Sequence, residues 1–312
     1  MSHDVTLSSH SLTESHRAGP WTGPVPILAA AVLWGTTGTA STLAPAAAPA
    51  AAIGSAGLVL GGLLLFLTAG RRPAYTRAEW RLLTAGAVAV AGYPITFYPA
   101  VARTGVAVAT VVALCSAPVF AGLLTWITGR SRPTGRWAAA TVAAVLGCGV
   151  LVLGPQLVGE TATVDLIGFL LAGCGGLTYV VYSLIGGGLI ARGHPSGSVM
   201  GVMFGMAGVL VSPVLLVTNS AWLTTFRGVT VVLHLAVCTT FLAYRLFGYG
   251  LRHTSVEVAT TLTLAEPAVA ALLGATVLGE RLPAVSWCGL VVLASGLAVL
   301  TIRVRGRSAR GR

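Results

Sequence analysis

Ten apolar stretches, each long enough to cross a lipid bilayer, follow one another along this 312-residue chain. A membrane-spanning helix needs about 20 mainly apolar residues. Backbone polar groups in lipid must be bonded within helices or closed barrels. The sequence therefore predicts an all-α integral membrane protein. The predicted helices cover residues 24–44, 51–70, 82–101, 104–128, 135–154, 164–190, 198–217, 228–250, 254–278 and 283–303.

The composition agrees with this interpretation. Only 9% of the residues are charged and 55% are hydrophobic, whereas a soluble domain carries about 25% charged residues. Forty glycines are typical of helices that approach closely in a membrane. The five cysteines lie far apart in apolar segments without a CxxC pair, which favours buried small side chains over a disulfide framework or a metal site.

The basic residues are all arginines, and their distribution predicts the orientation. They give a net charge of +11 but form no stripe interleaved with aromatics, so they do not indicate nucleic-acid binding. If the N-terminus is cytoplasmic, most arginines fall in inside segments, as the positive-inside rule requires. We expect residues 1–23 to be a disordered cytoplasmic tail, without the apolar core of a signal peptide, and residues 304–312 a basic cytoplasmic tail. The predicted outside segments hold only Arg103, Arg227 and Arg281.

The two halves of the chain resemble each other. FYPAVARTGVAVAT at 97–110 aligns without gaps to FGYGLRHTSVEVAT at 247–260, with six identities where about one or two are expected by chance. Each half holds five predicted helices, in residues 24–154 and 164–303. Because five is odd, the second copy must enter the membrane from the opposite side. The sequence thus predicts two inverted five-helix repeats, an arrangement common in secondary transporters.

Two carboxylates, Glu257 and Glu266, lie in the predicted helix 254–278. A charge at the bilayer centre costs roughly 2.5–3.5 kcal/mol on insertion scales. Pro267 follows Glu266 and lacks a backbone donor, which predicts an irregular helix there. We interpret Glu266 as a proton- or cation-binding group in a central cavity, with a structural carboxylate as the alternative. Glu257 lies nearer the cytoplasmic end, where its side chain can reach the headgroups.

Arg245 and several aromatic residues complete the candidate site. Arg245 can bind a substrate carboxylate, balance Glu266, or extend to the cytoplasmic headgroups. Trp and Tyr usually form belts at the membrane interface, but Trp34 and Tyr179 lie near mid-helix and suit a cavity wall that contacts an amphipathic solute. The predicted substrate-binding residues are Glu266, Arg245, Trp34, Tyr179, Tyr93 and Tyr244.

No motif indicates an enzyme or an ATP-driven pump. HExxH, GxSxG and P-loop patterns do not occur in the sequence, and no two histidines are spaced four apart. We therefore expect no catalytic activity and no cofactor, and any uphill transport would use a gradient.

The sequence resembles the EamA family of the drug/metabolite transporter superfamily over about residues 24 to 303. The resemblance rests on Trp34-Gly35, Pro118 and Gly129 in the first half. In the second half it rests on Pro267, on the run Leu278-Gly279-Glu280-Arg281-Leu282, and on Gly289 and Gly296. The first half departs from the family at Arg130, where an acidic residue like Glu280 is common.

The resemblance implies a ten-helix transporter of two inverted repeats in the cytoplasmic membrane, which moves small organic metabolites such as amino acids or drug-like compounds. It also implies that Glu280-Arg281 is a structural or gating pair. We expect a secondary exporter that works by alternating access, with a small-molecule substrate, the lipid bilayer and protons as partners. The alternatives are a facilitator or importer of the same solutes, and a non-transporting membrane scaffold or sensor.

Overall fold

The computed structural model describes residues 21–46, 48–70, 73–129, 132–157, 165–218, 221–277, 279 and 282–302. Within these residues the chain is helical and forms no strand. The α-helices are α1 Pro24–Thr42, α2 Ala50–Leu67, α3 Arg77–Ile127, α4 Gly135–Leu157, α5 Leu166–Ala191, α6 Ser196–Val217, α7 Phe226–His234, α8 Ala243–Gly250, α9 Val256–Leu262, α10 Ala265–Val277 and α11 Ala284–Ile302. A 3-10 turn, η1, covers Ala221–Thr224, and a π-helical segment, η2, covers Leu235–Leu242.

Eight helical segments in the described residues are long and apolar enough to cross a membrane. The expected ten helices are therefore not all found as separate spans. One reason is that the predicted helices 82–101 and 104–128 are joined in the single element α3. Another is that α1 carries Thr36, Thr37 and Thr39 in its second half, which lowers its apolar character.

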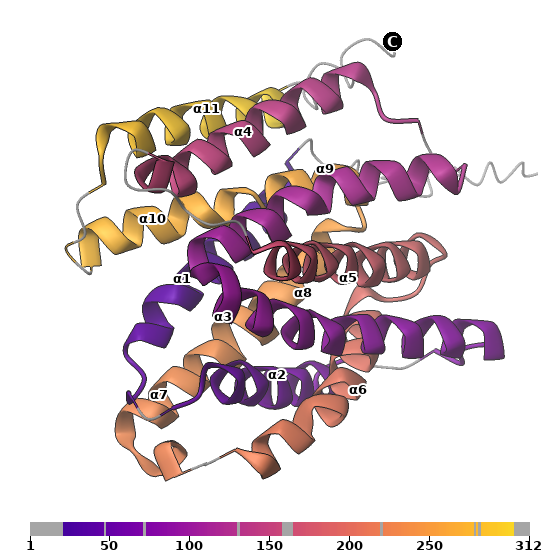
Figure 1. Ribbon diagram of the computed structural model, residues 1–312. Coiled ribbons are helices and arrows are strands. Elements are labelled where there is room, and N and C mark those ends of the chain that lie inside the picture. Colours follow the sequence, from indigo (N-terminus) through magenta and orange to yellow (C-terminus); the bar gives the residue numbers. More distant parts are fainter. Residues whose placement is uncertain are drawn as a thin grey trace, which may run out of the picture.

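A bend at Gly105 divides α3 into two limbs (Figure 1). A straight helix of 51 residues would be about 77 Å long, more than twice the roughly 30 Å of a bilayer core. Gly105 has φ 81° and ψ 161°, a conformation that is essentially restricted to glycine. In Figure 1 the two limbs diverge from this residue, and α5, which packs against α3, lies between them.

An ion pair fastens the bend of α3 to the start of α5. Arg103 Nε lies 3.1 Å from Asp165 Oδ1. The same carboxylate caps α5 by accepting a hydrogen bond from the Gly168 amide at 2.7 Å. The hydrogen bonds from the Gly168 amide and from Arg103 lower the pKa of Asp165 below its usual value.

Two other predicted helices are irregular. The predicted helix 228–250 is continuous but contains η2 at its centre, between α7 and α8. The predicted helix 254–278 is present as one apolar span, Val256–Val277, but it is interrupted at Thr263 and Leu264, between α9 and α10.

Helices far apart in the sequence pack in pairs. α2 lies against α6, α4 lies against α11, and α1 contacts both α8 and α10 (Figure 1). The largest buried cluster draws side chains from α1, α3, α5, α6 and α8. Its centre holds the aromatic residues described next.

The predicted tails, 1–23 and 304–312, lie almost wholly outside the described residues. The same is true of Arg130 and of the Glu280-Arg281 pair.

Candidate functional site

Glu266 lies where the ninth predicted helix is interrupted. α9 ends at Leu262 and α10 begins at Ala265, so Glu266 is in the first turn of α10. Its amide donates to the Thr263 carbonyl at 3.0 Å. A helix N-terminus has a positive electrostatic potential, which favours a carboxylate there. Pro267 is accommodated because the first turn of a helix requires few backbone donors.

Gly35 brings α1 close to this turn. A Cβ atom at residue 35 would lie 2.7 Å from Val269 Cβ and 3.0 Å from the Glu266 carbonyl oxygen. Only glycine fits this approach without a shift of the helices. The neighbouring Trp34 is thereby held at the level of Glu266.

An interior aromatic cluster packs beside Glu266. We define it as Trp34, Tyr179, Tyr182, Phe204, Tyr244 and Phe247. The rings of Trp34 and Tyr244 are 5.0 Å apart, and those of Phe204 and Tyr244 are 4.0 Å apart. Tyr182 and Tyr244 are joined by a hydrogen bond of 2.9 Å between their hydroxyl groups. Rings from α1, α5, α6 and α8 thus meet in one place.

Two polar contacts tie this cluster to the irregular helix segments. The Trp34 indole donates to the Thr239 carbonyl in η2 at 2.8 Å. The Tyr179 hydroxyl lies 3.2 Å from Thr263 Oγ1, at the break between α9 and α10. The cluster is therefore attached to both places where the second half of the chain departs from regular α-helix.

The Glu266 carboxylate has no hydrogen-bond or ion-pair partner among the residues that the structure describes. It interacts electrostatically with the hydroxyl groups of Tyr93, Tyr179 and Tyr244, on α3, α5 and α8. Its side chain is nevertheless only half-buried. Glu266 thus lies among tyrosines from three helices of both halves of the chain.

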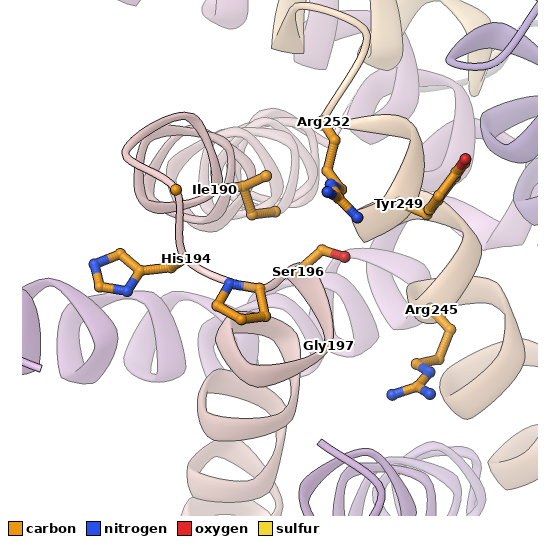
Figure 2. A pocket seen from close by; sticks show the side chains of 9 residues that line it. Ile190, His194, Ser196, Gly197, Arg245, Tyr249 and Arg252 are labelled. Atoms are coloured by element: carbon orange, nitrogen blue, oxygen red, sulfur yellow. The ribbon is translucent and has the colours of Figure 1, made fainter. Parts of the chain in front are cut away.

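Arg245 lies elsewhere. Its Nη1 donates to the Thr68 carbonyl at the C-terminus of α2, at 2.9 Å, a position that favours a cation. Its guanidinium also lies 5.8 Å from the Phe241 ring. No interaction in the described residues joins Arg245 to Glu266. Figure 2 shows Arg245 instead in a separate pocket with Arg252 and the first residues of α6.

Five of the six predicted site residues therefore lie in one region, and Arg245 does not. Tyr182, Phe204 and Phe247 belong to the cluster but were absent from the predicted site. Tyr182 had a detectable signal, since it is three residues from Tyr179 and shares its helix face. Phe204 and Phe247 had none, because an apolar residue in a membrane helix is equally suited to face lipid.

The described residues contain no group of three or more His, Cys, Asp or Glu side chains that could hold a metal ion. The site therefore consists of aromatic rings, hydroxyl groups and one carboxylate. Such groups can contact an organic solute by stacking and hydrogen bonding, and the carboxylate can exchange a proton.

Long apolar helices around an interior polar site define a multi-pass membrane protein. The sequence profile of the EamA-like transporter family matches this chain twice, at residues 21–153 and 166–302. The chain belongs to that family, and its general function is transport across a membrane.

Two further similarities agree with this assignment. The chain is 36% identical over 281 residues to a Bacillus subtilis (strain 168) protein named "Uncharacterized transporter YwfM", covering 89% of this chain and 93% of the relative. A crystal structure at 22% identity superposes with a TM-score of 0.75, covering 91% of this chain and 98% of the other. The second similarity concerns the fold alone.

Proposed function

We propose that this protein is a secondary transporter that exports a small organic metabolite by alternating access. The single observation that carries the proposal is Glu266, an interior carboxylate without a hydrogen-bonding partner in the described residues, beside the rings of Trp34, Tyr179 and Tyr244. Intramembrane carboxylates of this kind commonly mark proton relays or substrate paths. The solute stacks on the aromatic cluster, and Glu266 exchanges a proton during the cycle.

We further propose that the fold consists of two inverted five-helix repeats in the cell membrane, with both termini cytoplasmic. The packing of α2 against α6 and of α4 against α11 supports this arrangement, because these helices hold matching positions in the two halves. In a two-fold arrangement, matching helices meet across the axis. Substrate sites of inverted-repeat transporters lie near the midplane between the repeats, which is where the aromatic cluster would lie.

The solute is found first by comparing metabolites inside and outside cells that contain or lack the protein. Efflux of that solute is then measured from proteoliposomes with and without a pH gradient, for the unmodified protein and for Glu266→Gln. The substitution keeps the shape of the side chain and removes its titration. We expect Glu266→Gln to lose the dependence of efflux on the pH gradient.

The matched control is Asp165→Asn, which removes a carboxylate from the exposed start of α5. This variant loses the ion pair with Arg103 but keeps a side-chain oxygen that can cap α5, so it is expected to keep the pH dependence of efflux. If Glu266→Gln also transports at the unmodified rate with unchanged pH dependence, proton coupling through Glu266 is wrong. Solute counterflow that is indifferent to the pH gradient in every variant would identify a facilitator instead.

A further inference from the structure

A pocket of about 440 Å³ lies outside the aromatic site, between α8 and the turn that joins α5 to α6. Arg245 and Arg252 line one side, and Ser196 and Gly197, the first residues of α6, line the other. In Figure 2 the Arg252 guanidinium is directed toward the start of α6, whereas the Arg245 guanidinium is directed away from Arg252. The transport proposal uses none of these residues.

The pocket has an excess of positive donors. No aspartate or glutamate is among its lining residues. Arg252 is exposed and contacts the Tyr249 ring at 5.9 Å, with no ion pair in the described part of the chain. Arg245 uses one N–H for the Thr68 carbonyl, whereas a guanidinium carries five. Most of the donors of both arginines are therefore available to a ligand.

The start of α6 adds a second positive feature. Its N-cap, Pro195, has no side-chain hydrogen bond to the helix. The Ser198 and Val199 amides donate to the Pro195 carbonyl, at 3.0 and 3.1 Å, so the first-turn amides left without an intrahelical acceptor are those of Ser196 and Gly197. A Cβ atom at residue 197 would lie 2.9 Å from Arg245 Nη1. Glycine thus lets a guanidinium rest against the positive end of a helix, an arrangement that an anion would stabilise.

His194 also lines the pocket but points away from it in Figure 2. Its Nε2 lies 2.7 Å from Glu79 Oε1 at the start of α3. This contact and the hydrogen bonds from Thr76 engage the Glu79 carboxylate, and in the described residues it forms no ion pair with either arginine. The two guanidinium groups and the α6 amides therefore act without a competing acid.

We propose that this pocket binds a phosphate group, supplied by an anionic phospholipid headgroup or by a phosphate-bearing solute. Arginine matches phosphate because its planar fork donates two parallel hydrogen bonds. Tyr249 is 40% exposed at the rim, as is typical of aromatics at headgroup level. The contact of His194 with Glu79 places the pocket near the start of α3, where Arg77 and Arg81 are predicted to be cytoplasmic. A lipid of the inner leaflet would therefore reach the pocket.

The test measures lipid binding by native mass spectrometry. It uses the full-length protein, delipidated in neutral detergent. Short-chain phosphatidylglycerol is titrated against short-chain phosphatidylcholine. The pocket variants are R252Q and R245Q/R252Q. The control is R77Q/R81Q, which removes the same charge from exposed positions at the start of α3. Size-exclusion profiles check that each variant is folded. If the double variant does not fold, R252Q still tests the pocket, because it leaves the Arg245–Thr68 hydrogen bond intact.

We expect phosphatidylglycerol to bind more tightly than phosphatidylcholine. Each pocket arginine contributes about 1 kcal/mol, so R252Q weakens binding roughly fivefold and the double variant ~25-fold. The control should bind as the unmodified protein does. Equal weakening by pocket and control variants, or no preference for phosphatidylglycerol, would overturn the proposal.

A separate titration with inorganic phosphate distinguishes the two sources of the ligand. If phosphate binds with the same arginine dependence and displaces phosphatidylglycerol, a free phosphate group suffices. If phosphate has no effect while phosphatidylglycerol binds, the ligand is the lipid headgroup. Both results support the pocket.

Discussion

Trp34 joins α1 to the π-helical segment η2 through one buried hydrogen bond. Its side chain is 9% exposed, and the indole donates to the Thr239 carbonyl at 2.8 Å. Trp34→Phe keeps an aromatic ring in the cluster but removes the donor. A buried carbonyl that loses its partner costs about 1–3 kcal/mol. We expect a lower midpoint of thermal unfolding for the purified protein in detergent.

Trp126→Phe is the matched control, because Trp126 is 59% exposed on the outer face of α3. It should leave the midpoint almost unchanged. Equal shifts for both variants would mean that loss of indole surface, and not loss of the hydrogen bond, determines the effect.

Of the residues that the sequence predicted for a site, the structure brings five together and leaves Arg245 apart, for a physical reason. Glu266 was found because a charge in an apolar helix is costly and needs an explanation. Trp34 was found because a polar-tipped ring at mid-helix lies away from the interface. The sequence could not place Arg245, because its partner, the Thr68 carbonyl, is 177 residues away, and the chemistry of arginine suits an interior ion pair as well as a helix C-terminus.

At the scale of elements, the bend in α3 depends on one residue. Gly105 has φ 81° and ψ 161°, and a side chain in this region costs about 1–3 kcal/mol. We expect Gly105→Ala to lower the thermal unfolding midpoint in detergent. No atom lies within 4 Å of a Cβ built there, so the cause would be backbone strain and not a clash.

Gly149→Ala supplies the control for this experiment. Gly149 lies inside α4 and also has open space around a built Cβ, but its backbone is helical. Alanine favours a helix over glycine by about 1 kcal/mol, so this variant should keep or raise the midpoint. If Gly105→Ala behaves in the same way, the bend does not need glycine.

Helix irregularities set the limit of what the sequence could predict about elements. Apolar length predicted where helices lie, because a bilayer demands about 20 such residues. It did not predict η2, since the composition of Leu235–Leu242 is that of an ordinary membrane helix. It also joined α9 to α10, because Pro267 suggested a kink at Glu266, whereas the helix is interrupted before it, at Thr263 and Leu264.

At the scale of the whole molecule, the sequence predicted two similar halves but not how their helices meet. Every helix carries small apolar residues, so many helix pairs could pack closely. Which helices do pack depends on whether the faces formed by their small residues are complementary in shape. Gly147 and Gly289 illustrate this, because a Cβ on either would lie within 3 Å of backbone on the opposite helix, α11 or α4. Such complementarity is visible only once both helices are placed.

The number of membrane crossings can be tested on α3 alone. The limb from Arg77 to Thr104 is about 42 Å long, and the limb after Gly105 is about 33 Å. Each is long enough to cross a core of roughly 30 Å. If α3 crosses twice, its two ends share one side of the membrane and the bend lies on the other. If it crosses once, its ends are on opposite sides.

Single cysteines at Ala78, Ala102 and Thr128, all exposed positions, distinguish these arrangements. They are introduced into a chain whose five native cysteines are replaced by alanine, and intact cells are treated with a membrane-impermeant maleimide. We expect label at 102 only, because arginines favour the cytoplasmic side for both ends of α3. Lysed cells, in which all three positions should react, show that each site is accessible.

Label at either end without the other would mean a single crossing. Label at 78 and 128 but not at 102 would keep the two crossings and reverse the orientation. The reversed orientation would also place the arginine pocket away from the inner leaflet, because the contact of Glu79 with His194 holds the pocket at the same end of the molecule as the start of α3.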